Sequence, residues 1–397
     1  MAEHLTVLSL PYSRPTTPGI NNAPVQIGFV GIGSMGYYMA RNLAKRSTSP
    51  VLPSLPLKVW NRSPEKALKL KKELGKELIA VAESIEEIAT SCDIIFSNLA
   101  NDDIVKNIFL EPNVYHIPFK LSPPTKNKIF VETGTILPRL AGELDHLISG
   151  LAHSHFICCP VFGRPAVADK AQLVLVMAGE YRSKKEVAYL VVPAVGRKVI
   201  DLGENVEKGE TQSSHVLPAL KALAAPTFKL LGNSMILGAM EVVAEAYTLG
   251  DKAGIEAERV NELVGDILPA PSLMGYAERM AHDDYNGVDG FSLDGGIKDA
   301  SQVSFLECSK YPSLIDFLFS HLRRLTAQYN VPMPVIDIAH QHLITARAIH
   351  SSQKEEGLQT LDILDWSALI AGSRVAAGLD PFNSRKKKAV VEEIDDA

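Results

Sequence analysis

Residues 26–36 read Gln26-Ile27-Gly28-Phe29-Val30-Gly31-Ile32-Gly33-Ser34-Met35-Gly36, and this stretch decides which fold we expect. Its apolar first half fits a buried strand, and three glycines follow in the G-x-G-x-x-G spacing. Gly31 permits a tight turn, Gly33 lets the backbone approach a pyrophosphate, and Gly36 lets helix and strand pack closely. The apolar pattern of residues 39–43 then predicts a helix, whose N-terminal amides can bind phosphate. The stretch therefore predicts a dinucleotide site formed by Gly31, Gly33, Ser34, Met35 and Gly36.

The composition is that of a globular protein with two or three domains, because the chain has 397 residues and is 46% hydrophobic. The formal charge of −6 argues against nucleic-acid binding. No apolar run of about 18 residues predicts a membrane span, and no basic segment followed by an apolar one predicts a signal peptide. We expect a soluble, cytoplasmic protein without nucleic-acid or membrane partners. Four cysteines predict no disulfide framework, and the adjacent Cys158 and Cys159 fit core packing.

Apolar runs alternate with helical stretches from residue 26 onward, which predicts βα units and a parallel sheet. Further strands are expected at 57–60, 93–97, 128–131, 155–158, 173–177 and 197–203. Residues 1–25 contain four prolines and predict a flexible N-terminal arm, and the proline-rich residues 47–56 predict a surface loop. We therefore predict a Rossmann domain over residues 26–204.

The strand signal ends near residue 205, and helical spacing takes over. Residues 228–252 contain no proline and predict one long helix that is apolar on all sides. Such a helix is expected to be buried, plausibly against a partner subunit. Shorter helices are expected up to about residue 377. We predict an all-helical substrate and dimerisation domain over 205–380 and a charged tail over 381–397.

The end of the strand at 57–60 carries the prediction of cofactor choice. An NAD-binding domain usually has an acidic residue here for the ribose 2′-hydroxyl, but this chain has Asn61-Arg62-Ser63. Arg62 can bind a 2′-phosphate with two hydrogen bonds, and Ser63 can add a hydroxyl donor. The alternative is a solvated arginine in a turn before Pro64. We favour NADP over NAD, bound in part by Asn61, Arg62 and Ser63.

Three other loops follow predicted strands at the carboxyl edge of the sheet, where a cofactor binds. They are residues 98–101, 132–135 and 160–165. We therefore predict that Leu99, Ala100 and Thr135 contact the cofactor. Thr133 is predicted to lie near the substrate, although plain turn capping is an equal alternative for both threonines.

Five segments in the same order resemble the β-hydroxyacid dehydrogenases, the family that includes 3-hydroxyisobutyrate dehydrogenase and is related to 6-phosphogluconate dehydrogenase. They are residues 31–36 with 39–43, 132–138, 160–179, 229–233 and 298–299. The resemblance covers roughly residues 26–375. It implies an α/β fold in which a Rossmann-type dinucleotide-binding domain precedes an all-α C-terminal domain.

The resemblance also implies roles for residues of the second half. Lys229 matches the catalytic lysine, which gives a proton to the substrate oxygen or takes it, and Asn233 matches the asparagine that hydrogen-bonds the substrate. The two lie four residues apart and so share a helix face. Lys298 matches a lysine near the active site and is predicted to contact the cofactor. Spacing alone favours a surface lysine at position 229, and only the resemblance favours catalysis there, while Lys298 could equally be a solvated partner of Asp299.

Departures from the family pattern concern the substrate. The family has Ser-Gly-Gly where this chain has Phe162-Gly163-Arg164, and its serine in the second loop is Gly134 here. We predict that Phe162, Gly163 and Arg164 contact the substrate. Arg164 could pair with a substrate carboxylate or phosphate, and Phe162 could supply an apolar wall.

The leading hypothesis is an NADPH-dependent oxidoreductase that acts on a small 3-hydroxy acid or a related aldehyde or ketone and forms a homodimer. One alternative is an imine reductase, which does not normally carry the lysine. Another is a non-catalytic cofactor-binding protein that acts through protein contacts. No metal site is predicted, because the pairs His153/His155 and His340/His342 lack further ligands.

Overall fold

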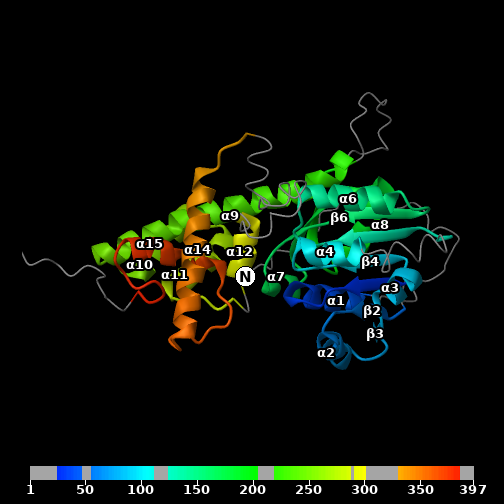
Figure 1. The fold of residues 1–397 in the computed structure, drawn as a ribbon, viewed down its shortest axis with the longest axis horizontal. Helices are drawn as coiled ribbons and strands as arrows, with labels where there is room; N and C mark the ends of the chain where they lie inside the picture. The colour runs from blue at the N-terminus through cyan, green and yellow to red at the C-terminus, as the bar shows by residue number, and fades with distance from the viewer. Residues whose placement is uncertain are drawn as a thin grey trace, which may run out of the picture. The chain divides into compact units, whose positions relative to one another are not determined.

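The computed structural model describes residues 25–46, 55–110, 124–203, 219–287, 290–300 and 330–384. They form two compact units that divide between Lys229 and Leu230 (Figure 1). Residues 1–24 of the predicted arm, residues 47–54 of the predicted loop and residues 385–397 of the predicted tail lie outside the described residues.

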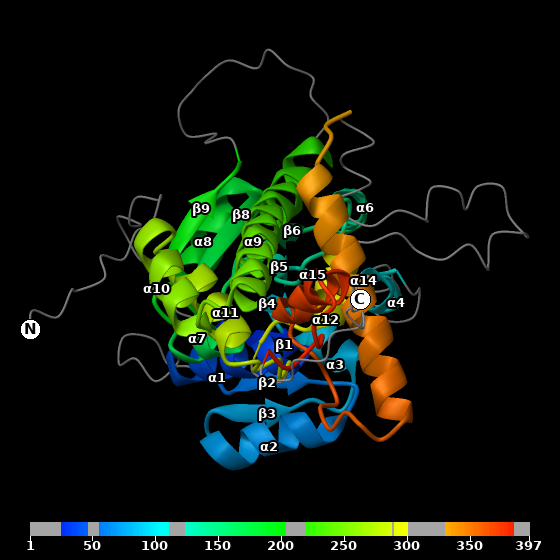
Figure 2. The same ribbon diagram turned by 90° about the vertical axis from the view of Figure 1, so that its left-hand side faces the viewer.

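The first unit contains a nine-stranded sheet in the order β3-β2-β1-β4-β5-β6-β8-β7, with β9 paired to β8. Figure 2 shows this succession from β3 toward β9. The strands are β1 (Ile27–Val30), β2 (Leu57–Trp60), β3 (Ile79–Val81), β4 (Ile94–Ser97), β5 (Lys128–Glu132), β6 (Ser154–Cys158), β7 (Val161–Phe162), β8 (Leu173–Gly179) and β9 (Gly196–Asp201). The first six run parallel, and β8 pairs antiparallel with β6 and β7. The order 3-2-1-4-5-6 is that of a Rossmann domain, so the predicted fold class is confirmed.

Seven described helices accompany this sheet, and two apolar cores fill its two faces. The helices are α1 (Ser34–Arg46), α2 (Pro64–Leu74), α3 (Ile85–Ser91), α4 (Asp102–Phe109), α6 (Pro138–Ser149), α7 (Pro165–Asp169) and α8 (Tyr181–Val191). Because strand side chains alternate, Phe29 belongs to the core that includes residues of α1, α2, α7 and α8. Its neighbour Val30 belongs to the core that includes residues of α3, α4 and α6. Cys159 and Cys158 divide between the same two cores, and burial raises the pKa of both thiols, so the prediction of core packing is confirmed.

Helices build the second unit, together with two isolated β-bridges. The long helix α9 (Ala219–Ala253) begins in the first unit and continues into the second. The others are α10 (Ala257–Ile267), α11 (Pro271–Ala281), α12 (Leu293–Ala300), α14 (Pro334–Glu355), the 3₁₀ helix η5 (Trp366–Leu369) and α15 (Ile370–Ala376). Their apolar core includes Met240, Tyr247, Leu343 and Trp366. The prediction of a helical C-terminal half ending near residue 377 is confirmed.

Two details of the sequence prediction are wrong. The long helix begins at Ala219 and includes Pro226, whereas the sequence predicted a proline-free helix over residues 228–252. The short strands β3 and β7 were missed, because three and two residues carry too little apolar pattern. Met235 and Leu249 on the long helix are 76% and 71% exposed in the single chain, so its burial against a partner subunit stays a prediction.

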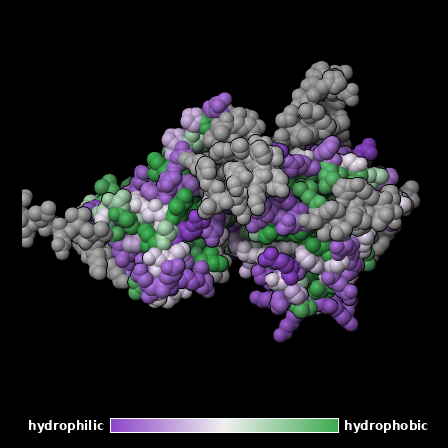
Figure 3. Space-filling view, viewed as in Figure 1, coloured by the Kyte–Doolittle hydropathy of each residue, from purple (hydrophilic) through white to green (hydrophobic). Residues whose placement is uncertain are grey.

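The surfaces of both units mix polar and apolar side chains (Figure 3). Among the described helices, none is both long and apolar enough to cross a membrane.

Candidate functional site

The glycine loop between β1 and α1 has the geometry that its motif predicts. Gly31 has φ +94°, and a side chain there would collide with the carbonyl oxygen of Asn98. A Cβ on Gly36 would overlap the carbonyl oxygen of Gly31, so helix and turn approach as only glycine allows. Gly33 differs, because no heavy atom lies within 4 Å of the place where its Cβ would be. The loop is therefore tight at its two ends and open in the middle, beside the first amides of α1.

Asn61 fastens this loop to the end of β2. Its Oδ1 accepts a 2.8 Å hydrogen bond from the Ile32 amide, and its Nδ2 donates a 2.8 Å bond to the Ser63 carbonyl. The side chain that was predicted to contact the cofactor is thus engaged within the protein on both of its polar atoms. Its role in the structure is to hold the glycine loop, which the sequence did not indicate.

Arg62 and Ser63 follow Asn61 and are both exposed. In the part of the chain that the structure describes, the Arg62 guanidinium has no hydrogen bond or ion pair. Ser63 is the N-cap of α2, but its hydroxyl accepts no capping bond, and Pro64 at the first helical position has no amide hydrogen. A guanidinium, a hydroxyl and a helix N-terminus are therefore adjacent at the end of β2 and suit an anion.

The loops after β4 and β5 are joined by side chains of their own. Thr133 is 2% exposed, and its hydroxyl donates to the Ser97 carbonyl at 2.7 Å and accepts from Asn98 Nδ2 at 3.0 Å. The hydroxyl that was predicted to face the substrate thus closes these two loops together. Thr135 is half-buried.

Leu99 and Ala100 end the loop after β4. Leu99 is half-buried beside Gly31 and Gly134, whereas Ala100 is exposed. The structure therefore brings the loops after β1, β4 and β5 to one edge of the sheet, as predicted.

Glu132 is a fully buried acid at this same edge, and the sequence reasoning did not select it. Its carboxylate accepts from the Ser97 hydroxyl at 2.5 Å and from the Gly134 amide at 2.6 Å. Burial raises the pKa of Glu132 to about 7, although these two hydrogen bonds oppose the increase. The one sequence signal was an acidic residue directly after the apolar run Ile129-Phe130-Val131.

Lys229 contacts the loop predicted to bind substrate, within the first unit. Phe162 ends β7, which pairs with β8 through Phe162 and Val174. The Lys229 side chain reaches the face of the Phe162 ring, with its Nζ 4.1 Å from the ring centroid, and Lys229 is only 9% exposed. Three predicted site residues, Phe162, Gly163 and Lys229, thus lie within one small region.

Gly163 and Arg164 complete the turn after Phe162. Gly163 has φ +142°, and a Cβ there would overlap the Leu173 side chain, so the turn requires glycine. Arg164 is half-buried and is the N-cap residue of α7. The turn therefore sets Arg164 two residues from the aromatic ring that contacts Lys229.

Asn233 and Lys298 lie in the second unit, and Asp299 joins them. Asn233 is 5% exposed, and its Nδ2 donates a 2.8 Å hydrogen bond to Oδ2 of Asp299. The Lys298 ammonium lies 3.4 Å from Oδ1 of the same carboxylate. Asp299 was missed as a site residue, and its position beside Lys298 in the sequence was the available signal. Lys298 and Asn233 are thus linked through one buried carboxylate.

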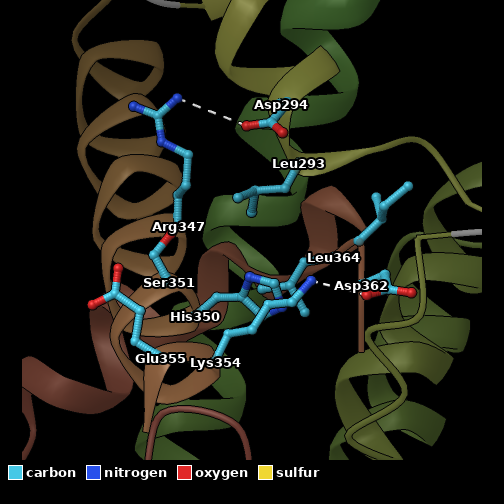
Figure 4. A pocket seen from close by; sticks show the side chains of 10 residues that line it. Leu293, Asp294, Arg347, His350, Ser351, Lys354, Glu355, Asp362 and Leu364 are labelled. Carbon is cyan, nitrogen blue, oxygen red and sulfur yellow. Dashed lines mark hydrogen bonds and ion pairs between the residues drawn. The ribbon is translucent and has the colours of Figure 1, made fainter. Parts of the chain in front are cut away.

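Two surface hollows contain none of the predicted site residues. One, of about 400 Å³ in the second unit, is bordered by α12, α14 and residues 362–364, with ion pairs Arg347–Asp294 and Lys354–Asp362 (Figure 4). The other, of about 600 Å³ in the first unit, lies beside the ends of α1 and α7. In the described segments, no group of three or more His, Cys, Asp or Glu side chains is arranged to hold a metal ion.

Comparison with known proteins finds relatives among the oxidoreductases. Residues 26–203 match the family model of the NAD binding domain of 6-phosphogluconate dehydrogenase. The chain is 24% identical over 351 residues to the uncharacterized oxidoreductase YfjR of Bacillus subtilis, covering 87% of this chain and 99% of YfjR. It is 26% identical over 309 residues to the NADH-dependent oxidoreductase ucdB of Aspergillus ustus, covering 78% and 88%.

A solved structure extends the likeness to both units. The 3-hydroxyisobutyrate dehydrogenase of Salmonella typhimurium superposes with a TM-score of 0.62 over 87% of this chain and 99% of that chain, at 18% identity. The family model over residues 26–203 and the dehydrogenases among the relatives support the resemblance to the β-hydroxyacid dehydrogenases. The chain is an oxidoreductase that depends on a nicotinamide dinucleotide.

Proposed function

We propose that this protein is a β-hydroxyacid dehydrogenase that uses NADP(H) to interconvert a small 3-hydroxy acid and the related aldehyde or ketone, with Lys229 as the acid and base. The observation that carries the proposal is the 9% exposed ammonium of Lys229 on the ring of Phe162, in the loop predicted to bind substrate. A buried ammonium is suited to proton transfer, because few water molecules compete for its protons.

The residues around the glycine loop fit a phosphorylated dinucleotide. The open space at Gly33 and the first amides of α1 would receive the pyrophosphate. Arg62 and Ser63, exposed at the end of β2, would hold a 2′-phosphate. The name of the Aspergillus relative specifies NADH, so the identity of these two residues in this chain is the argument for NADP. When bound, the nicotinamide supplies or accepts the hydride.

The proton is handled by the chain itself. In the reducing direction, Nζ of Lys229 gives a proton to the substrate oxygen as charge develops there, and in the oxidising direction the neutral amine takes it back. Asn233 follows one helical turn later on α9 and can hydrogen-bond the same oxygen without adding charge. Asp299 accepts from the Asn233 amide and so fixes its orientation.

Arg164 supplies the means to recognise an acidic substrate. Its guanidinium can pair with a carboxylate or phosphate, while Phe162 forms an apolar wall. Lys298, which is ion-paired to Asp299, is proposed to contact the cofactor. The half-buried Thr135 is proposed to contact the ribose of the cofactor.

An imine reductase is the second candidate. The observation that favours it is Phe162, because an aromatic ring beside the reacting group suits a cyclic imine better than a carboxylate. The presence of Lys229 favours the dehydrogenase.

A homodimer through the helical domain is part of the proposal. Leu231, Met235, Val242 and Leu249 are each more than half exposed on α9. At 100° per residue these four side chains fall within about 40° of one another around the helix. A continuous apolar stripe of this kind is typical of a surface that a second copy covers.

The function is tested by NADPH oxidation with a panel of semialdehydes and cyclic imines. Lys229→Ala is compared with Lys252→Ala, which changes an exposed lysine of the same helix. We expect Lys229→Ala to lower kcat for semialdehydes about 10²- to 10⁴-fold, with Lys252→Ala unchanged. Imine reduction that survives Lys229→Ala would select the second candidate.

A further inference from the structure

The ammonium of the buried Lys229 contacts the face of an aromatic ring. Its Nζ lies 4.1 Å from the centroid of Phe162, well within the range of a cation–π interaction. Burial of an ammonium disfavours its charged form unless a partner compensates. The negative face of the ring is such a partner, and its effect increases as water is removed.

Phe162 is also held rigidly by its surroundings. It pairs with Val174 in the sheet, and the following Gly163 adopts a conformation that only glycine accepts easily. The ring of Phe228, the residue before Lys229, meets Phe162 at 6.4 Å and an interplanar angle of 78°. Two consecutive residues of α9 therefore contact one ring, which fixes the direction in which the Lys229 side chain leaves the helix.

We propose that Phe162 is a positioning residue for Lys229, and that its ring face holds the ammonium charged and in place before substrate binds. This inference rests on the proposed function only for the role of Lys229 in proton transfer. An ammonium has three N–H groups, and a ring engages it from one side. The Lys229 ammonium is then already in place when it donates a proton to the substrate oxygen. Less entropy is therefore lost on reaching the transition state.

The interaction predicts that Lys229 resists acylation in the protein without cofactor or substrate. The measurement is the rate at which acetic anhydride modifies Lys229, followed by peptide mass spectrometry. The exposed Lys72 of α2 serves as the internal reference. The key variant replaces Phe162 by pentafluorophenylalanine, which keeps the shape of the ring but removes its negative face. Phe162→Leu and Phe162→Trp complete the series.

We expect the Lys229/Lys72 rate ratio to rise about 3- to 30-fold in the pentafluoro and Leu variants, as a cation–π interaction of ordinary strength implies. Phe162→Trp should keep the ratio at or below the value of the unsubstituted protein, because indole is the better cation–π partner. Equal ratios for phenylalanine and pentafluorophenylalanine would overturn the inference. Since the pentafluoro ring has nearly the same shape, a change in accessibility does not explain the expected result.

Turnover gives the second measurement and separates this inference from the proposed function. The pentafluoro variant should lower kcat about 3- to 30-fold and leave the Kd for NADPH unchanged. If Lys229→Ala keeps full activity, the proposed function fails, whereas the acylation result still decides whether the ring holds the ammonium. If Lys229→Ala is inactive but the pentafluoro variant is fully active, the positioning role fails and the proposed function stands.

Discussion

The Ser97 hydroxyl donates a 2.5 Å hydrogen bond to the carboxylate of Glu132, and this bond joins the ends of β4 and β5 beside the proposed cofactor site. Glu132 is fully buried, and burial raises its pKa from 4.5 to about 7. The folded protein therefore retains a proton that the unfolded chain loses at lower pH.

The first prediction is that stability declines as pH rises from about 4.5 to about 7. Across this window the unfolded chain releases the Glu132 proton first, so the free energy of unfolding falls by up to about 3 kcal/mol. Glu132→Gln keeps the shape without the titration and should remove this part of the pH dependence. Urea unfolding at pH 5 and pH 8 measures it, and parallel pH profiles of the two proteins would contradict it.

The second prediction separates two glycines of the cofactor loop. Gly33→Ala places a methyl group in open space, so the melting temperature should stay within about 2 °C while NADPH affinity falls at least about tenfold. Gly36→Ala places a methyl group on the Gly31 carbonyl and should lower the melting temperature by several degrees. Calorimetry with and without NADPH measures both effects. If Gly33→Ala binds NADPH as tightly as the unsubstituted protein, the pyrophosphate does not bind at this loop.

The third prediction concerns cofactor choice. Arg62→Ala should weaken NADPH binding about 10- to 100-fold, the range expected for lost hydrogen bonds to a charged group, and leave NADH binding unchanged. Titration of both cofactors by fluorescence measures the difference. Lys72→Ala, at the other end of the same helix, is the matched control. Equal loss for NADPH and NADH would assign Arg62 a role other than phosphate binding.

The fourth prediction tests the buried pair Asn233 and Asp299. Asn233→Asp would place two carboxylates within hydrogen-bond distance at sites that are 5% and 2% exposed. Such a pair retains a shared proton, because both groups cannot ionise readily. Stability should then be close to normal at low pH and fall by a few kcal/mol as pH rises above about 5. Asn233→Ala, which lacks the second carboxylate, is the control and should not show this pH dependence.

The fifth prediction concerns the apolar stripe of α9. Met235→Glu and Leu249→Glu place charges on two strongly exposed positions and should convert a dimer to a monomer in light-scattering measurements. Because both side chains are solvated within the single chain, the fold itself should tolerate the changes. Lys252→Glu is the control at an exposed position of the same helix. If all three variants keep the molar mass of a dimer, the dimer interface does not include this stripe.

The parts of the fold that could be predicted are those in which local pattern and tertiary environment agree. The strand over residues 57–60 was placed without error, because apolar residues occupy three of its four positions. The long helix was predicted only over the proline-free residues 228–252, whereas α9 begins at Ala219 and has Pro226 seven residues inside it. Packing of Ala225 into the core of the first unit favours continuing the helix past the proline.

In the candidate site, too, the residues that could be predicted are those whose role depends on local sequence. Gly31 and Gly36 could be predicted, because their requirement for glycine is local to one turn. Asn61 and Glu132 could not, since their hydrogen-bond partners Ile32 and Ser97 lie 29 and 35 positions away in the sequence. Nothing local distinguishes such a side chain from one that faces a ligand.

Asn61 and Arg62 are neighbours in sequence but differ in what the folded chain requires of them. Asn61 is hydrogen-bonded to the glycine loop, whereas Arg62 has no such attachment among the described residues. Replacing Asn61 would therefore remove a hydrogen bond that holds the glycine loop, whereas replacing Arg62 would leave that loop intact. Under the proposed assignment of Arg62 to the 2′-phosphate, evolution could change the coenzyme preference through one substitution, with no second mutation needed to restore folding.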